Sequence, residues 1–445
     1  MSSSASGTLL TSKAAGFTEE TFKAFLRDRD EPSWLTERRR EAFARFQASA
    51  WPSARDEEWR RTDIRGFKLD GFSPPSREQP TVAARESFDD QWNALSLHYA
   101  TGIEHINGSL VREPEPARLG GAVFVDLNRA VKDYPELLKR YLLTEAVTPA
   151  ADVFAALHSA FWTSGTLLYV PKGVALDAPL FELIGLAQEG QVDLSHTLIV
   201  LEDGAQATLV RESAGRGEGL LQALHVGAVE VFLAQGARLR LVNIQNWDEG
   251  TWHFSRERAL VGRDASLQWT VGGLGARVAK VNQEVALLGK GADAQVNGIM
   301  FTTGRQHLAY FTRQDHVAPH TTSDLLYKGG LKNKSRIVWK GMIRVEKDAQ
   351  RTNAYQKNDN LILSESARAD SIPGLEIEAN DVRCTHGATA GRVDDEMIFY
   401  AQARAIPRQT AIRLIVEGFF ANVYDRITVE PVRETLRQAV ATKLA

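Results

Sequence analysis

Residues Val200–Val210 read VLEDGAQATLV, two β-prone runs separated by the small-residue turn Gly204-Ala205. The same pattern returns further along the chain, and its turn alanines are Ala237, Ala265, Ala292 and, in a weaker copy, Ala349. The first four turn alanines are 32, 28 and 27 residues apart, and the weaker copy lies 57 residues on, about two more such steps. A nearly constant spacing of roughly 20–50 residues indicates a repeat architecture.

The repeating units are strands without intervening helical periodicity, which argues against ankyrin, TPR and leucine-rich designs. A parallel β-helix stacks strand–turn–strand units so that each coil buries its inward face against its neighbours. An antiparallel sandwich is the competing architecture, but it favours Asn-Gly or Asp-Gly turns every ~8–12 residues, and these dipeptides are scarce here. The pattern therefore predicts a mainly β protein whose core, residues 164–389, is a parallel β-helix.

Helical patterns flank this core on both sides. Residues 17–163 are expected to be mainly helical with a linker at 73–90, and residues 1–16 to be a disordered tail. Residues 390–445 are expected to form helices that begin near Asp394, Pro407 and Pro431. The apolar residues of these helices include Phe419, Phe420, Val432, Leu436 and Val440. We expect the helices either to cap the open end of the β-helix or to dock onto another protein.

Composition restricts the class of protein. The chain has 445 residues, a formal net charge of -3 and one cysteine. This charge gives no attraction to nucleic acid or to an anionic membrane, and one cysteine excludes an internal disulfide framework. No apolar run approaches the ~18–20 residues of a membrane helix, and the Ser- and Ala-rich start lacks the pattern of a secretory signal. We therefore expect a soluble cytoplasmic protein that binds neither nucleic acid nor membrane.

The cysteine lies in the stretch Leu375–Thr389, which begins with the alternation of apolar and polar residues of a half-buried strand. Continuing the alternation places Cys384 and His386 on one face, because residues two apart in a strand share a face. A thiolate and an imidazole suit a metal such as iron or zinc, and the same pair suits a nucleophile with its base. A third interpretation is that Cys384 is a small buried apolar residue and His386 its polar neighbour.

Motifs for a complete active site are absent from the sequence. It contains no G-x-x-x-x-G-K-[ST] phosphate loop, no C-x-x-C, no H-E-x-x-H and no G-x-S-x-G. His316 and His320 have the spacing of a metal-binding pair on a helix, but Pro319 argues against a helix there. One thiolate cannot hold an iron–sulfur cluster, which needs about four protein ligands. If Cys384 and His386 bind metal, the remaining ligands must come from another chain.

Several segments resemble the SufB/SufD family of iron–sulfur cluster assembly scaffolds. The most specific are Ala349–Gln356, Asn360–Ser364, Leu375–Thr389, Asp394–Tyr400 and Gly418–Phe420. Glu58–Asp63 is similar to the N-terminal signature of the family. Cys384–Thr389 reads CTHGAT and resembles the SufD branch, since SufB proteins tend to have His-Glu-Ala-Thr at this place and carry more cysteines. The resemblance covers nearly the whole chain.

The resemblance implies a right-handed parallel β-helix between N-terminal and C-terminal helical regions. It implies a non-catalytic scaffold subunit of the SufBCD complex, paired with a SufB-like relative through the C-terminal ends of their β-helices. His386 and, less strongly, Cys384 would lie at that interface, where iron or an iron–sulfur cluster is held transiently. A SufC-like ABC ATPase would bind the C-terminal helices and supply the nucleotide site that this chain lacks. The expected docking residues are Phe419, Phe420, Val432, Leu436 and Val440.

Two other functions remain as alternatives. The first is a homodimeric scaffold that works without a SufB-like partner. The second is a carbohydrate-modifying enzyme, because β-helices also host polysaccharide lyases. Such enzymes are usually secreted, and the lack of a secretory pattern at the start of the sequence disfavours this interpretation.

Overall fold

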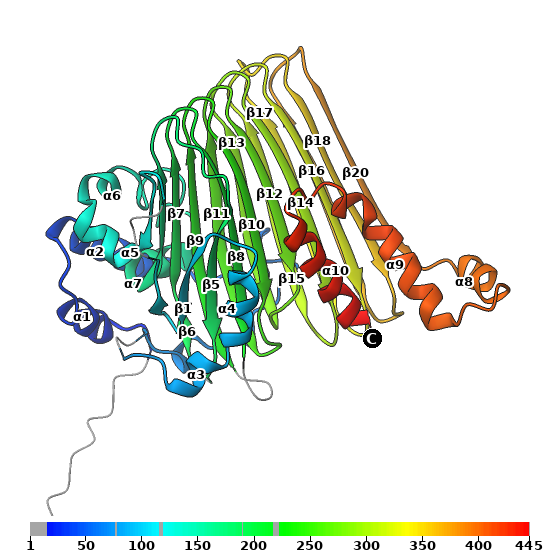
Figure 1. Ribbon diagram of the computed structural model, residues 1–445, viewed down its shortest axis with the longest axis horizontal. Coiled ribbons are helices and arrows are strands. Elements are labelled where there is room, and N and C mark those ends of the chain that lie inside the picture. Colours follow the sequence, from blue (N-terminus) through cyan, green and yellow to red (C-terminus); the bar gives the residue numbers. More distant parts are fainter. Residues whose placement is uncertain (1–15, 76–77, 115–118, 189, 217–221, 445) are drawn as a thin grey trace, which may run out of the picture.

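The computed structural model describes residues 16–75, 78–114, 119–188, 190–216 and 222–444 (Figure 1). The tail expected at 1–16 lies outside the described residues, apart from Gly16. In the described part of the chain two ten-stranded sheets enclose the main apolar core, and helices pack on their outer faces (Figure 1). This parallel β-solenoid with flanking helices confirms the predicted mainly β fold.

Sheet A contains, in spatial order, β2 (Ser109–Arg112), β1 (Thr101–Ile106), β5 (Leu180–Leu186), β8 (Gln206–Gly215), β10 (Arg238–Asn246), β12 (Ser266–Gly273), β14 (Asp293–Thr302), β16 (Thr322–Leu331), β18 (Asn353–Ile362) and β20 (Arg383–Arg392). Sheet B contains β19 (Arg368–Ile377), β17 (Arg336–Val345), β15 (His307–His316), β13 (Val278–Leu287), β11 (Thr251–Val261), β9 (Ala223–Leu233), β7 (Ser195–Leu201), β4 (Ser164–Val170) and β3 (Val123–Asp126), with β6 (Val192–Asp193) beside β9. From β7 to β20 the chain alternates between the sheets, so each coil contributes one strand to each sheet.

A tight turn links the two strands of a coil. Gly204, Gly236, Asp264 and Gly291 have φ between 55° and 75°, and the alanine that follows each is at most 1% exposed. Left-handed backbone favours glycine and tolerates aspartate, and the buried position after it has room only for a small side chain. The pattern GA or DA at each repeat follows from these two requirements.

The later coils keep the turn geometry but change the buried residue. His320 (φ 60°) precedes Thr321, and Arg351 (φ 59°) precedes Thr352. The two threonines are buried, and their hydroxyl oxygens lie 3.2 Å apart on successive coils. The weak repeat assigned to Ala349 is therefore three residues out of register, because threonine replaces alanine at the true turn position.

The N-terminal helices are α1 (Glu19–Arg27), α2 (Ser33–Ala48), α3 (Val82–Glu86), α4 (Asp89–Ser96), α5 (Leu127–Asp133), α6 (Pro135–Tyr141) and α7 (Val153–Phe161), with a 3-10 turn at Leu69–Gly71. Aromatic side chains attach α1, α2 and α7 to the outer face of sheet B. Phe22 of α1 stacks on Phe43 of α2 at 4.1 Å between ring centroids, and Phe154 of α7 stacks on Phe254 of β11 at 3.8 Å. Burying these rings stabilises the contact beyond its area alone.

The boundaries differ from the expected ones in three places. The region 17–163 also contains β1, β2 and β3, of which β1 pairs with β5 and β3 with β4, so it extends both sheets. The linker expected at 73–90 contains α3 and the start of α4, and the last strand ends at Arg392 rather than at 389. Strands of four to six residues carry little periodicity, and the partners of β1 in β5 and of β3 in β4 lie about 80 and 40 residues along the chain, so local patterns do not reveal these pairings. The hairpin of β1 with β2 does carry a local signal, the turn Asn107-Gly108.

The C-terminal helices are α8 (Asp395–Gln402), α9 (Arg408–Tyr424) and α10 (Glu430–Leu444). Helices α9 and α10 lie along the outer face of sheet A, whereas α8 projects away from the solenoid (Figure 1). The interpretation of these helices as an end cap is therefore wrong, since they cover a side of the solenoid. Among the residues that the structure describes, no helix is long and apolar enough to cross a membrane.

Candidate functional site

The last coil, formed by β19 and β20, leaves the inward face of the solenoid uncovered. Leu375 and Ile377 pair with Ile343 and Val345 of β17, which are fully buried, so they point inward as well. Nevertheless they are 36% and 41% exposed, because no further strand of the described residues pairs with β19 or β20. A solenoid end with exposed inward-facing apolar residues is suited to stacking against another layer of strands.

Cys384 and His386 lie on β20 at this uncovered end. They pair with Ala354 and Gln356 of β18, both buried, and paired residues of parallel strands share a face. Cys384 and His386 therefore both lie on the inward face, as their spacing predicts. The stretch Leu375–Thr389 is nevertheless not one strand, because β19 ends at Ile377 and β20 begins at Arg383.

The two side chains differ in their surroundings. Cys384 is half-buried against a small apolar cluster that includes Val345 and Ala354, whereas His386 is exposed. Burial raises the pKa of the Cys384 thiol, and a backbone hydrogen bond from Ala354 offsets part of that rise. The thiol is thus protonated at neutral pH, which disfavours an activated cysteine nucleophile in the isolated chain.

Neither residue completes a metal site within this chain. Across the described ranges, no three His, Cys, Asp or Glu side chains are grouped so that they could hold a metal ion. His316 and His320 do not form a pair either. His316 is held by Thr321 Oγ1 at 2.7 Å and Ser323 Oγ at 2.8 Å, while His320 occupies the left-handed turn position.

The residues predicted to dock an ATPase have a different role in the fold. Phe420, Val432, Leu436 and Val440 are at most 2% exposed and pack, with half-buried Phe419, in the apolar cluster between α9, α10 and sheet A. Their amphipathic spacing attaches the helices to the solenoid, so this docking assignment is wrong for the buried four. The most exposed large apolar residues of this region are instead on α8, where Met397, Phe399 and Tyr400 are 57%, 74% and 61% exposed, and Leu414 of α9 is 48% exposed.

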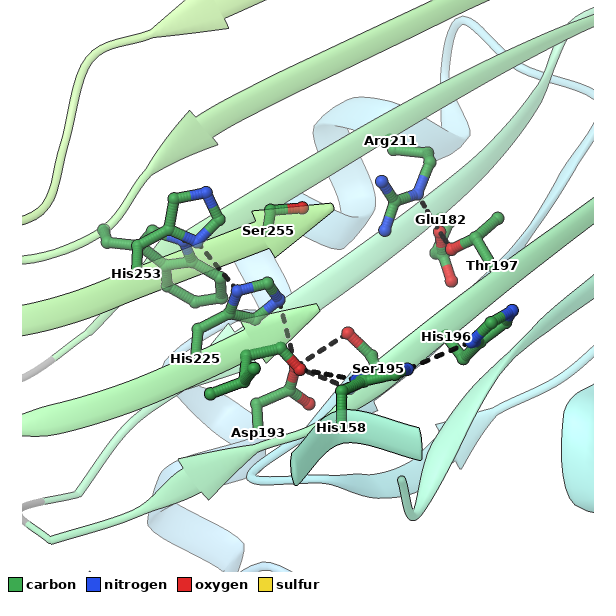
Figure 2. Close-up of polar contacts among 12 residues, drawn as sticks. His158, Glu182, Asp193, Ser195, His196, Thr197, Arg211, His225, His253 and Ser255 are labelled. Atoms are coloured by element: carbon green, nitrogen blue, oxygen red, sulfur yellow. Dashed lines mark hydrogen bonds and ion pairs between the residues drawn. The ribbon is translucent and has the colours of Figure 1, made fainter. Parts of the chain in front are cut away.

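The sequence reading missed a buried polar network in the N-terminal half of the solenoid (Figure 2). Between α7 and sheet B, His158 Nε2 lies 3.0 Å from His196 Nδ1, and His196 Nε2 lies 3.0 Å from Glu230 Oε2. Glu230 also accepts the backbone N–H groups of Leu143 and Val147 at 2.7 and 2.9 Å. Burial and the adjacent His196 lower the pKa of His158 to about 3, so the His158 imidazole is neutral in this chain of contacts.

A second cluster lies on the inward face of sheet B (Figure 2). The Nδ1 atoms of His225 and His253 are 2.7 Å apart, and Trp247 Nε1 donates to His253 Nδ1 at 3.2 Å. His253 Nδ1 is then the acceptor and His225 Nδ1 the donor, which leaves His225 Nε2 without a proton, 3.4 Å from Asp193 Oδ2. Burial raises the pKa of Asp193, which fits a protonated carboxyl beside that nitrogen.

The repeat spacing contained a signal for this cluster. His225 and His253 are 28 residues apart, the length of one coil, and they occupy paired positions of β9 and β11. Aligning the repeats by their turns would have placed these histidines side by side. The contact of His158 with His196, by contrast, depends on how α7 packs on the sheet and has no such signal.

Comparison with known proteins agrees with this arrangement. Residues 184–419 match the family model described as the SUF system FeS cluster assembly SufBD core domain, and residues 20–181 match the SufBD protein N-terminal region. The two models together span the N-terminal helices, the solenoid, α8 and most of α9, but not α10.

Curated relatives give the same result. An iron–sulfur cluster assembly SufBD family protein of Mycobacterium tuberculosis is 31% identical over 388 residues, which are 85% of this chain and 91% of that protein. SufBD family proteins of Staphylococcus haemolyticus and Staphylococcus aureus are 28% and 27% identical over 423 residues, 91% of this chain and 88% of each relative. The chain therefore belongs to the SufBD family of iron–sulfur cluster assembly proteins.

Proposed function

We propose that this chain is a non-catalytic, SufD-like scaffold subunit of a cytoplasmic SufBCD complex. The observation that carries the proposal is the uncovered end of the solenoid. Inward-facing Leu375 and Ile377 are exposed there, and Cys384 and His386 lie on the inward face of the same coil. A SufB-like relative with its own solenoid covers this end, because stacked coils bury such apolar residues.

The interface holds iron or a nascent iron–sulfur cluster as cargo. His386 is the principal ligand from this chain, since it is exposed to the partner, and Cys384 is the secondary one, since its thiol is half-buried. The SufB-like partner supplies the remaining ligands, because this chain has two and a cluster needs about four. Thiolate and imidazole are suitable ligands for iron.

The SufC-like ATPase binds α8. Helix α8 projects from the solenoid (Figure 1). Its residues Met397, Phe399 and Tyr400 are exposed and apolar, and exposed apolar surface of this kind marks protein interfaces. Helices α9 and α10 are fastened to sheet A by Leu436 and its neighbours, so a force applied at α8 is passed to the solenoid. The chain itself binds no nucleotide, since its sequence has no phosphate loop.

The test is reconstitution with the ABC ATPase and the cysteine-richer SufB-like relative from the same genome. We expect a stable three-protein complex in size-exclusion chromatography with light scattering. Added iron and sulfide should give cluster absorption with the complex and none with this chain alone. If a homodimer of this chain assembles clusters without the SufB-like relative, the heterodimer proposal is wrong and the homodimeric scaffold takes its place.

A further inference from the structure

The inward face of the solenoid carries a polar stripe within its otherwise apolar core. Glu257, Gln283 and Thr312 occupy paired positions on β11, β13 and β15, so their side chains lie on successive rungs about 4.8 Å apart. Tyr327 of β16 donates its hydroxyl to Gln283 Oε1 at 2.6 Å across the interior. The stripe therefore joins both sheets over several coils.

The stripe continues to the uncovered end. Asn358 of β18 pairs with Tyr327, accepts from Asn360 Nδ2 at 2.7 Å and accepts from Ser371 Oγ at 2.5 Å. Gln356, two residues before Asn358 on the same inward face, pairs with His386. Polar side chains thus follow one another from the coil of Glu257 to the coil of His386.

Several atoms of this stripe have no partner within the described residues. They are Glu257 Oε2, Gln283 Nε2, Thr312 Oγ1, Gln356 Oε1 and Asn360 Oδ1, on residues that are at most 3% exposed. Buried polar atoms in folded proteins are almost always bonded to protein or to ordered water. This set contains both donors and acceptors. A small molecule that both donates and accepts hydrogen bonds, bound in several copies, can therefore satisfy all of them.

A cavity lies beside the stripe. Its lining includes Arg211, Asn243, Gln245, His253 and Tyr310 and, from the stripe, Glu257 alone. About 10 Å³ of it has room for the centre of a water-sized sphere. One water molecule needs about that much room and at least two polar partners. Arg211 Nε is already paired with Glu182 Oε2 at 2.5 Å, so the lining does not present an unpaired cation to an anion.

We propose that the interior of the solenoid binds a column of ordered water molecules, which extends from Glu257 to the inward face of the uncovered end beside His386. Each water bridges side chains on adjacent rungs and satisfies the atoms that lack a protein partner. Burial raises the pKa of Glu257, and its Oε2, which has no partner among the described residues, bonds the first water. Hydration of the column requires neither a partner protein nor a cluster, and so does not depend on the proposed function.

The direct test is a high-resolution crystal structure of the full chain. We expect ordered waters within hydrogen-bond distance of Glu257 Oε2, Gln283 Nε2 and Thr312 Oγ1. An experimental structure in which these side chains are rotated to pair directly with one another, with no water between them, overturns the proposal.

A second test distinguishes a wet interior from a dry one in solution. The variant Thr312→Val replaces the hydroxyl by a methyl group of nearly equal size. If a water bonds to the hydroxyl, the variant removes one partner of that water and the melting temperature falls. If the site is dry, the variant removes an unsatisfied buried hydroxyl, and the melting temperature is unchanged or rises, which overturns the proposal.

The matched control is Thr197→Val. The Thr197 hydroxyl is equally buried and donates to Glu182 Oε2 at 2.8 Å, so its removal breaks a hydrogen bond within the protein. The fall in melting temperature of this control gives the scale for one lost hydrogen bond. If the column is hydrated, the melting temperature of Thr312→Val falls as that of the control does. If the column is dry, the melting temperature of Thr312→Val stays the same or rises.

Discussion

Burial separates the two candidate ligands at the scale of single residues. Cys384 and His386 lie two positions apart on one face, yet Cys384 contacts the apolar cluster of the last coil and His386 is open to solvent. A ligand to cargo shared with a partner has to be reachable from outside this chain. The exposed imidazole meets that condition better than the half-buried thiol.

The first prediction is that His386→Ala impairs cluster assembly and spares stability. An exposed side chain contributes little to folding, so the free energy of unfolding should change by less than about 0.5 kcal/mol. Cluster absorption in the reconstituted complex should fall strongly, and Cys384→Ser should reduce it less, because partner cysteines still reach the site. Thermal melts beside reconstitution spectra measure both effects. Normal cluster formation by a well-folded His386→Ala complex would refute the ligand assignment.

The second prediction concerns the buried imidazole of His158. Its folded-state pKa is lowered to about 3, so between pH 6.5 and 3 the unfolded chain binds a proton that the folded chain does not. The stability that this residue contributes is therefore lost as pH falls below about 6.5, by about 2 kcal/mol between pH 7 and pH 5. His158→Gln should be less stable at pH 7, but its deficit should shrink by about that amount at pH 5. Urea unfolding at both pH values measures the deficit, and a constant deficit would contradict the buried neutral state.

At the scale of elements, glycines within strands make room for the large side chains of the interior. A Cβ atom on Gly298 of β14 would lie 2.3 Å from the ring of Tyr327, and one on Gly341 of β17 would lie 2.2 Å from the ring of Trp339. Both rings are fully buried between the sheets and cannot move aside. These strands therefore lack a side chain where the neighbouring ring occupies its place.

The third prediction is that Gly298→Ala destabilises the solenoid. The added methyl group overlaps the Tyr327 ring, so we expect a loss of about 1–3 kcal/mol in the free energy of unfolding. Gly391→Ala on β20 is the control, because a Cβ there meets nothing within 4 Å. Its unfolding free energy should stay within about 0.5 kcal/mol of the parent. Equal effects of the two substitutions, measured in denaturant, would show that Tyr327 has room to shift.

The apolar residues of the C-terminal helices fall into two groups, those buried against sheet A and those exposed on α8. Leu436 of α10 is fully buried over the backbone of sheet A, where its Cδ2 would lie 2.7 Å from a Cβ on Gly272. Phe399 and Tyr400 of α8 are exposed, and Arg404 lies over the Tyr400 ring at 3.5 Å. Removing everything after residue 406 would uncover the outer face of sheet A, so a truncation cannot test docking without harming the fold.

The fourth prediction uses point substitutions instead. Phe399→Ala with Tyr400→Ala should leave stability within about 0.5 kcal/mol and weaken ATPase binding at least about tenfold, as loss of an aromatic anchor does. Leu436→Ala should have the opposite profile, with a loss of about 2–5 kcal/mol in unfolding free energy and near-normal binding at temperatures where it is folded. Calorimetry of binding and denaturant unfolding measure the two quantities. Unchanged ATPase affinity of the α8 variant would place the docking site elsewhere.

At the scale of the whole molecule, the solenoid is covered on its sides and uncovered at one end. Helices α1, α2 and α7 pack on sheet B, and helices α3, α4, α9 and α10 pack on sheet A (Figure 1). Inward-facing residues of β19 and β20, by contrast, are exposed. Edge strands with exposed apolar residues pair with other chains unless they are protected. Association through this end is the arrangement that buries them.

The fifth prediction is that Leu375→Lys with Ile377→Lys prevents association with the SufB-like relative. The ammonium groups would have to be buried without partners when another layer of strands stacks on the end. Leu288→Lys is the control, since Leu288 is 45% exposed but lies directly after β13, in the middle of the solenoid. Sedimentation of the mixed proteins measures association. Association of the double variant as strong as that of the control would exclude this end as the interface.

The sequence by itself determined the repeating strand–turn–strand coil of the solenoid. Positive φ and a small buried neighbour are requirements of the individual turn, so they appear as Gly-Ala or Asp-Ala at every early repeat and reveal the period. The shared face of Cys384 and His386 follows from the two-residue period of a strand in the same way. These properties depend on backbone geometry within a few residues, and a local pattern records them.

Only the tertiary structure decided which apolar surfaces are buried against this chain and which are left for another. Helical spacing shows that Leu436 and Val440 share a stripe, but not that sheet A lies beneath it. Strand alternation shows that Ile377 points inward, but not that the solenoid stops there and leaves it exposed. The contacts of His158 with His196 and of Tyr327 with Gln283 join residues 38 and 44 positions apart. Such contacts are fixed by how whole elements pack, and no local sequence pattern carries that information.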